Sequence, residues 1–404
     1  MHWLPYILLV CNFMSICDGA CPVKAITIVP VGDLVGEPLK TSDSYPAPYH
    51  SYDSLPFHSS NTTCFRIHQL LFNETVTILE ERNEEVCVQI SNMFYEQPYN
   101  TIKHDTYWTL KTNIITVPDL VKKGIDLSII PLPISYKNQP SLTQAKNIAT
   151  LAFPFHDPVT NTTFSAGTRF VINHTKKHAL VVWLLHPRRM VPISIEIPRR
   201  FLYFSSKPNT IKKTQNDFVT LIQKWAHQTG CIPYVWGGVS FTGTSPNEKF
   251  TKTSEPSSTG VKIIYHRPEC NSWPKTGFDC AGLIARAAQI CNIPYYFKNT
   301  NTLVKYLKPL EPNISVCNGD LLWFPGHVIV ISDVQKGLLV EARSYNHGFG
   351  KIQEIALPHV FKDITSIEKL TEAYFNKKEL KRLDSEGKVV QIIPHFKILM
   401  LASA

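Results

Sequence analysis

The sequence predicts a protein of class α+β, with an all-β amino-terminal half and a carboxyl-terminal half of helices and antiparallel strands. Short runs of Val, Ile, Thr and aromatic residues, separated by turn residues, fill the chain from about residue 24 to residue 200. Helical spacing appears from about residue 210, and three β runs follow in succession. At about 150 residues per domain, 404 residues allow two or three domains.

The composition excludes some classes of protein. Hydrophobic residues make up 44% and charged residues 18%, so the chain can bury a large core and is not disordered as a whole. The net charge of +9 comes without dense Lys/Arg tracts, and the pairs Arg188-Arg189 and Arg199-Arg200 lie among β runs, as solvated strand edges do. We therefore expect no nucleic-acid partner.

The amino terminus resembles an export signal. An apolar run from Leu4 to Ile16 is followed by small residues, which predicts a signal peptide over residues 1–20 that is cleaved near Ala20. No Lys or Arg precedes the run, so a lipid anchor on Cys21 and a buried first strand remain alternatives. No other segment has 18 uninterrupted apolar residues, so we expect an exported protein without a stable membrane span.

The amino-terminal half predicts small β units. The expected strands are Ala25–Val31, Thr75–Leu79, Val86–Ile90, Trp108–Leu110, Thr168–Asn173 and Ala179–Leu185. Residues 40–63, rich in Ser, Pro, Tyr and His, predict an irregular insertion. A second β segment is expected from about Ala149, after a polar stretch at 138–146.

In the carboxyl-terminal half, the residue pattern predicts two helices followed by three strands along the chain. Asn216–Thr229 has helical spacing and ends at Gly230. Residues 240–260, rich in Ser, Thr and Pro, predict an exposed loop, and a second helix is expected over Asp279–Ile290. The β runs that follow are Asp320–Phe324, His327–Ile331 and Leu338–Ala342.

One cysteine has the surroundings of a nucleophile. Asp279 is a good helix cap, which places Cys280 in the first turn, where unpaired amides and the helix dipole should lower the thiol pKa. Small Ala281 and Gly282 leave room beside the sulfur. For the other cysteines a buried apolar role is the default, and spacing leaves disulfides open. No CxxC or HExxH pattern occurs, so we expect no metal and no cofactor.

A base and an orienting carboxylate follow in the β runs. Pro325-Gly326 turns the chain so that His327 begins a strand, and a hairpin centred near Val334 brings Glu341 roughly opposite His327. A carboxylate there can fix the imidazole tautomer. Asn346 and His347, beyond the strand, are alternatives for this third position.

These segments resemble a known family. Asp279-Cys280-Ala281-Gly282-Leu283 is similar to the Asp-Cys-Ser-Gly-Leu motif of the NlpC-type cell-wall cysteine peptidases, whose peptidase domain is papain-like. The segments 234–238 (Tyr-Val-Trp-Gly-Gly), 318–321 (Asn-Gly-Asp-Leu) and 326–328 (Gly-His-Val) resemble three other motifs of that family, in the same order. The resemblance covers residues 215 to about 345.

The amino-terminal half resembles the bacterial SH3-like domains that precede the peptidase in γ-D-glutamyl-L-diamino acid endopeptidases. Segments 29–38, 69–71 and 76–81 carry this likeness, with Tyr107-Trp108 as a closing aromatic pair. The resemblance implies a first SH3-like domain over 24–125 with an insertion, a second over 145–207, and a peptidase domain over 210–404.

The resemblance implies a substrate and residue roles. Cys280 would attack the carbonyl of the γ-D-glutamyl–diaminopimelate bond in peptidoglycan stem peptides, His327 would act as base and acid, and Glu341 would orient His327. The remaining substrate-binding residues would be Asp279, Ala281, Tyr234, Trp236 and Tyr107, with Asp279 and Tyr107 pairing with the ammonium of a free amino-terminal L-alanine. A monomer in the periplasm or cell envelope of a bacterium is expected.

Three departures from the family pattern leave alternatives. Ala281 replaces the usual Ser, Glu341 replaces the more usual His, and the stretch between Gly238 and Asp279 is longer than usual. The alternatives are a non-catalytic peptidoglycan-binding protein with a degenerate peptidase domain, and an amidase or acyltransferase on the same fold.

Overall fold

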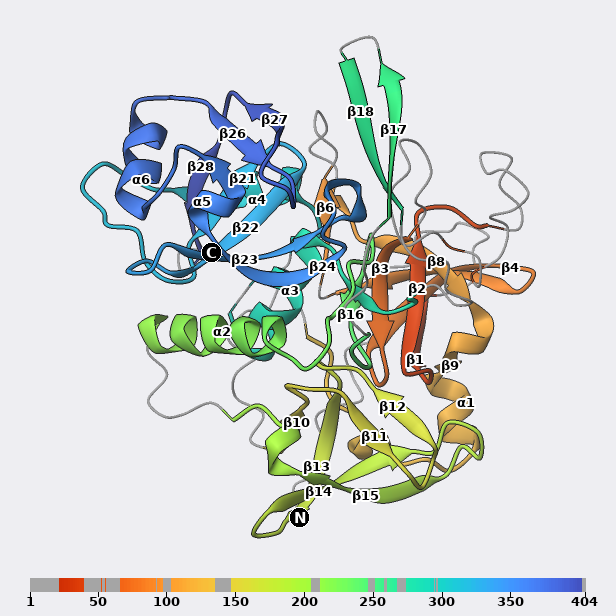
Figure 1. The fold of residues 1–404 in the computed structure, drawn as a ribbon. Helices are drawn as coiled ribbons and strands as arrows, with labels where there is room; N and C mark the ends of the chain where they lie inside the picture. Colours follow the sequence, from red (N-terminus) through yellow and green to blue (C-terminus); the bar gives the residue numbers. More distant parts are fainter. Residues whose placement is uncertain are drawn as a thin grey trace.

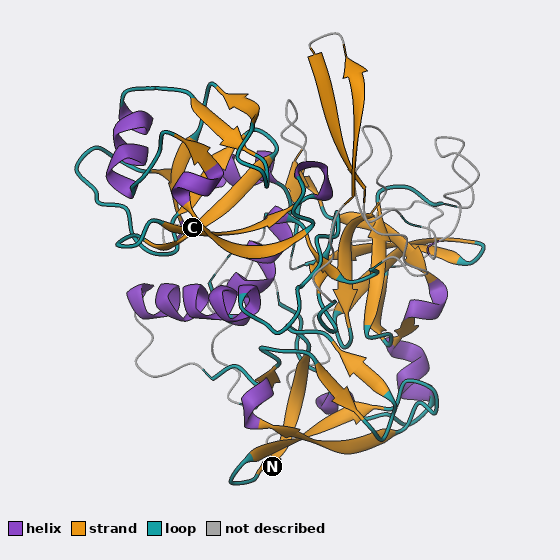
Figure 2. Ribbon diagram, viewed as in Figure 1, coloured by secondary structure: helices purple, strands orange, loops and turns teal. Residues whose placement is uncertain are grey.

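The computed structural model describes residues 22–39, 52, 55, 66–91, 93–96, 103–134, 147–204, 211–245, 251–257, 260–266, 274–293, 295 and 297–401. Sheets dominate this part of the chain (Figure 2), and the class is mixed α and β, as predicted. The predicted signal peptide, Cys21, the 138–146 stretch and nearly all of the 40–63 insertion lie outside the described residues.

The first β unit is a seven-stranded antiparallel sheet. Its spatial order is β3-β2-β8-β5-β4-β1-β9. The strands are β1 (Val23–Thr27), β2 (Val31–Val35), β3 (Arg66–Leu71), β4 (Thr75–Arg82), β5 (Glu85–Ile90), β8 (Thr106–Leu110) and β9 (Ile114–Thr116). The short ribbon of β6 (Tyr95–Glu96) and β7 (Lys103–His104) and the helix α1 (Val117–Lys122) complete the unit. The strands predicted over 75–79, 86–90 and 108–110 are therefore present, whereas the predicted strand Ala25–Val31 is wrong in its bounds, because β1 ends at Thr27 and β2 begins at Val31. The SH3-like character of the unit stays a prediction.

The second β unit packs directly on the first. Its sheet has the order β10-β13-β14-β15, from β10 (Ile148–Thr150), β13 (Arg169–Thr175), β14 (Ala179–Leu185) and β15 (Pro192–Pro198), beside a ribbon of β11 (Phe155–Asp157) and β12 (Thr162–Phe164). Phe72, which directly follows β3, packs against Phe164 with ring centroids 5.1 Å apart, and the Phe164 and Phe170 centroids are 5.3 Å apart. Because these buried rings come from both units, the two units share a core.

The carboxyl-terminal unit is built on a six-stranded antiparallel sheet with helices on both faces (Figure 1). The sheet consists of β20 (Lys308–Pro309), β28 (Lys397–Met400), β21 (Leu321–Phe324), β22 (His327–Asp333), β23 (Leu338–Arg343) and β24 (Lys351–Ala356), in this spatial order. The helices α2 (Ile211–Ala226), α3 (Cys280–Ile290) and α4 (Thr300–Tyr306) precede it in the chain.

The central strands are buried on both faces. Val328, Val330 and Val340 share a core with the apolar residues of α2 and α3. Ile329 and Leu339 share another core with α5 (Leu357–Val360) and α6 (Ile367–Phe375). A small sheet of β25 (Phe361–Lys362), β26 (Leu380–Leu383) and β27 (Val389–Ile393) belongs to that second layer. Alternation along a strand therefore sends neighbouring residues to opposite layers.

Two sequence-based boundaries need correction. The first helix runs over Ile211–Ala226, not 216–229. It begins before the predicted start, and it ends earlier because a turn leads from Ala226 to Gly230, whose φ is +86°. The stretch predicted as an exposed loop contains β16 (Val239–Ser240) and the first strand of a hairpin, β17 (Thr251–Ser257), which pairs with β18 (Gly260–His266). The hairpin projects from the body (Figure 1), and every residue of β17 has a ladder partner.

No helix in the described ranges is long and apolar enough to cross a membrane.

Candidate active site

Cys280 is the first residue of α3, as predicted. Asp279 caps the helix by accepting a hydrogen bond from the Gly282 backbone N–H. A Cβ on Gly282 would lie 2.0 Å from the Gly238 carbonyl oxygen, so only glycine lets this first turn pack against the loop before β16. β19 (Gly277–Phe278) pairs with β16 and delivers the chain to the cap. Cys280 is 9% exposed at this junction.

The thiol is held in its neutral form, which corrects the expectation of a lowered pKa. Burial and then the charge of Asp279 raise the pKa of Cys280 to about 12. The backbone N–H groups of Val328 and Ala281 and the charge of Lys298 act in the opposite direction without outweighing burial. The contact with Val328 places the sulfur at the start of β22, one residue from His327.

His327 and Glu341 meet in the buried sheet. The Nε2 atom of His327 lies 3.1 Å from a carboxylate oxygen of Glu341. The ladder pairs Val330 with Val340, and continuing it places Glu341 diagonally across from His327 rather than directly opposite. The reason is a register shift between Ile331 and Asp333, which adds a residue to β22 near the turn.

Two arginines that the sequence analysis did not identify complete this cluster. Arg382 on β26 donates to the Glu341 oxygen that faces His327, at 2.8 Å, and Arg343 lies 3.7 Å from the other oxygen. Gln353 on β24 also donates to Glu341, at 3.2 Å. Arg382 lies 41 residues beyond Glu341 on a strand of the outer layer, so no local motif could have marked it.

The cluster keeps His327 neutral and Glu341 charged. Burial and the charges of Arg382 and Arg343 lower the pKa of His327 to about 4, although Glu341 raises it. Arg382, the contact with His327 and Arg343 hold the pKa of Glu341 well below its usual range despite burial. The resting pair is thus a neutral imidazole bound to a carboxylate, a form that can accept a proton.

The lowered pKa of His327 predicts an acid-sensitive fold. The unfolded chain takes up a proton near the ordinary histidine pKa of 6.5, whereas folded His327 resists protonation down to about 4. Its contribution to the free energy of unfolding is therefore complete above pH 6.5 and is lost as the pH falls through 4. Urea unfolding of wild type and His327→Gln between pH 8 and pH 4 should show a stability difference that shrinks on acidification. A constant difference would contradict this prediction.

Asn346 and His347, the alternatives to Glu341 for orienting His327, lie outside this contact. His347 and Asn346 belong to a short 3-10 helix after β23, and Asn346 is exposed. His347 is close enough to Arg343, Arg382 and Glu341 for their charges to affect its pKa, but its strongest influence is burial, which lowers the pKa to about 4. The contact with His327 Nε2 is made by Glu341.

Asp279 is already paired with a cation of the chain itself. The Nζ of Lys298 lies 3.1 Å from Asp279 Oδ2, and the Lys298 side chain is 4% exposed. The same carboxylate oxygen accepts a hydrogen bond from the Gly237 backbone N–H at 2.9 Å. Asp279 was expected to bind a substrate ammonium, but in this structure Lys298 makes that contact.

The other predicted substrate-binding residues differ in exposure. Trp236 is 39% exposed, and its carbonyl oxygen faces Arg66 of β3 at 3.5 Å. Tyr234 and Ala281 are buried. Tyr107 is fully buried, its hydroxyl donates to the His104 carbonyl oxygen at 3.4 Å, and its ring lies beside those of His68 and Tyr95, so it is a core residue here.

Two buried polar side chains near Cys280 were also missed. Within the described part of the chain, the hydroxyl of Tyr295 and both ring nitrogens of His68 have no hydrogen-bond partner. Burial, and then Cys280 and Asp279, raise the pKa of Tyr295, and burial, and then Lys298 and Arg286, lower the pKa of His68. Both residues therefore lie close to the Asp279–Lys298 pair. His68 comes from β3 of the first unit, and sequence reasoning had no means to bring it here.

No group of three or more His, Cys, Asp or Glu side chains in the described ranges is arranged to hold a metal ion.

Comparisons with known proteins identify the fold. No protein-family model and no curated protein sequence matches the chain. Among solved structures, an NlpC/P60 family protein from Bacillus cereus aligns over 83% of this chain and 94% of its own, with a TM-score of 0.50 and 13% identity. NlpC2 from Trichomonas vaginalis aligns over 83% and 94% (TM-score 0.30, 12% identity), and the peptidoglycan hydrolase RipB from Mycobacterium tuberculosis over 38% and 68% (TM-score 0.21, 20% identity). The chain therefore has an NlpC-type fold, shared with the Bacillus cereus protein across nearly all of that protein's length.

Proposed function

We propose that the protein is a cysteine endopeptidase that hydrolyses the γ-D-glutamyl–diaminopimelate bond of peptidoglycan stem peptides. The observation that carries the proposal is a thiol at a helix start whose sulfur accepts a hydrogen bond from the Val328 backbone N–H, because the residue before Val328 in β22 is a buried histidine whose Nε2 lies 3.1 Å from a carboxylate. The NlpC-type fold agrees with this chemistry. We further propose that the protein is exported and acts at the cell envelope.

Because Cys280 and His327 are both neutral at rest, proton transfer accompanies the attack on the substrate in the proposed reaction. Cys280 transfers its proton to neutral His327 as its sulfur attacks the γ-carbonyl carbon of D-glutamate, so no stable thiolate precedes attack. The backbone N–H of Cys280 stabilises the oxyanion. The C–N bond then breaks, and the imidazolium returns the proton to the diaminopimelate amine. Water hydrolyses the thioester, releases the γ-carboxylic acid and regenerates the thiol.

Glu341 is a positioning residue in this proposal. It stabilises the imidazolium of His327 while its two arginine partners keep the carboxylate ionised. The decisive experiment is hydrolysis of L-Ala-γ-D-Glu-diaminopimelate by purified wild type. Absence of hydrolysis by a folded protein that still binds peptidoglycan would favour the non-catalytic alternative, and transfer of the acyl group to an added amine would favour an acyltransferase.

The Asp279–Lys298 pair predicts how the enzyme treats the amino end of its substrate. A free L-alanine ammonium has to displace Lys298 Nζ from Asp279, whereas an acetylated amino end does not. We therefore expect wild type to cleave N-acetyl-L-Ala-γ-D-Glu-diaminopimelate at least as efficiently as the free tripeptide, as measured by kcat/KM.

Lys298→Met should reverse this preference. The variant leaves the half-buried Asp279 without its cation, so the substrate ammonium should bind better, and the ratio of kcat/KM for the free tripeptide to that for the acetylated one should rise about tenfold. Lys305→Met is the control, because Lys305 lies on α4 and pairs with Glu96 instead. An unchanged ratio in Lys298→Met would contradict the assignment.

A further inference from the structure

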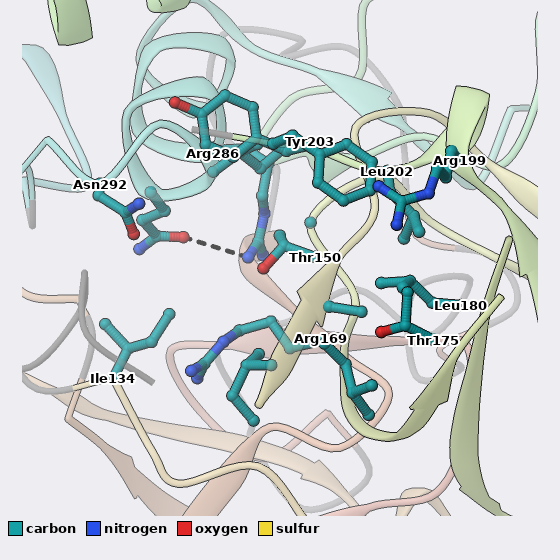
Figure 3. A pocket seen from close by; sticks show the side chains of 17 residues that line it. Ile134, Thr150, Arg169, Thr175, Leu180, Arg199, Leu202, Tyr203, Arg286 and Asn292 are labelled. Carbon is teal, nitrogen blue, oxygen red and sulfur yellow. Dashed lines mark hydrogen bonds between the residues drawn. The ribbon is translucent and has the colours of Figure 1, made fainter. Parts of the chain in front are cut away.

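A cavity of about 360 Å³ lies between the second β unit and the carboxyl end of α3. Its walls come from β10, β13, β14, the segment 199–204 and residues 286–292 (Figure 3). This volume is in the usual range for small-molecule sites. The cavity has no lining residue in common with the cluster around Cys280, although α3 runs from one to the other.

Basic side chains provide the charge of this cavity. Arg169, Arg199 and Arg286 line it, and none of the described residues that line it is acidic. Two carboxylates lie close to the cavity: Glu74, 3.0 Å from Arg286, whose charge also acts on Arg169, and Asp217, which accepts a hydrogen bond from the lining residue Tyr203 at 3.2 Å. Three arginines therefore face two carboxylates, and the cavity retains a positive charge.

The arginines have donors that the protein does not use. Arg286 donates through Nε to the Val239 carbonyl and through Nη1 to Glu74 and Gln289, while its buried Nη2 has no partner among the described residues. Arg169 uses Nη1 on the Leu132 carbonyl. Arg199 lies over the ring of Phe204, at 5.0 Å. A buried guanidinium without a partner costs free energy, which an oxyanion would recover.

The backbone is shaped to admit Arg286. Gly167 has a φ of +91°, and a Cβ there would lie 2.4 Å from Arg286 Cδ. Any larger residue at position 167 would therefore force Arg286 or the backbone to shift. The rest of the wall is apolar, from Ile134, Ile148, Ile172, Leu180, Leu202 and Ile290.

We propose that this cavity binds a small organic anion, with its phosphate or carboxylate group on Arg169, Arg199 and Arg286 and an apolar body against the isoleucine and leucine wall. Phosphate and carboxylate groups offer the same chemistry, because each presents two or more acceptor oxygens to the paired N–H donors of a guanidinium group. The proposal is independent of the peptidase function.

Three probes of similar body test it by isothermal titration calorimetry on the full chain. Phenyl phosphate and benzoate carry the two oxyanions, and benzyl alcohol carries none. We expect at least one anion to bind about tenfold more tightly than benzyl alcohol, and the stronger of the two identifies the source. Equal binding of all three, or no binding of either anion, would overturn the proposal.

Arginine variants locate the binding site. Arg169→Gln and Arg199→Gln should each weaken the anion about tenfold, whereas Arg188→Gln, an exposed arginine in the loop between β14 and β15, should leave it unchanged. Arg199 is exposed, so its variant tests the site even if Arg169→Gln fails to fold. Unchanged affinity in Arg199→Gln would overturn the proposal. Cys280→Ala should bind as wild type does, which separates this site from catalysis.

Discussion

Cys280→Ala is expected to reduce kcat/KM for L-Ala-γ-D-Glu-diaminopimelate by about 10³-fold or more, because the variant removes the atom that forms the acyl-enzyme. Cys280→Ser should lose nearly as much, since a buried hydroxyl is a weaker nucleophile than a thiol. Product formation by wild type and variants, followed by mass spectrometry of the released peptides, measures the loss.

Cys291→Ala is the matched control. Cys291 caps the other end of α3, is even more buried than Cys280, and burial likewise raises its pKa. Its loss should affect stability without abolishing hydrolysis. Equal activity of wild type and Cys280→Ala would overturn the proposed mechanism, and loss of activity in both cysteine variants would point to a packing effect of the helix instead.

Glu341→Ala should have the largest effect on the fold. The change leaves Arg382 and Arg343 buried without their carboxylate, and breaking a buried ion pair on one side costs about 3–5 kcal/mol. Denaturant unfolding measures this loss. Glu354→Ala on the next strand is the comparison, because its partners are Gln223, Ser332 and the exposed His227, and a smaller loss is expected.

Activity measurements distinguish a role of Glu341 in positioning His327 from a role in stabilising the fold. Glu341 raises the pKa of His327, so Glu341→Gln should move the acid limb of the kcat/KM profile to lower pH as well as reduce kcat. A variant that only loosened the fold would keep the wild-type pH profile in the surviving folded fraction. That outcome would remove Glu341 from the proposed mechanism and leave it a structural role.

Local signals predicted much of the candidate site. The cap at Asp279, the first-turn cysteine and the strand starting at His327 depend on residues within a few positions of one another, and all three are present. The start of α2 was missed because the apolar periodicity of its first residues is weak. The strand β17 was missed because its Ser, Thr and Pro residues are typical of a loop.

The sequence by itself determined the order of cysteine, histidine and glutamate, because each lies in an element whose period and turns are encoded locally. Only the tertiary structure decided their ionisation. Arg382 reaches Glu341 from an outer sheet, Lys298 reaches Asp279 across the chain, and burial keeps the thiol neutral. Charge and desolvation act through space, so residues distant in sequence determine the ionisation of Cys280, His327 and Glu341, although the sequence alone identifies these three residues.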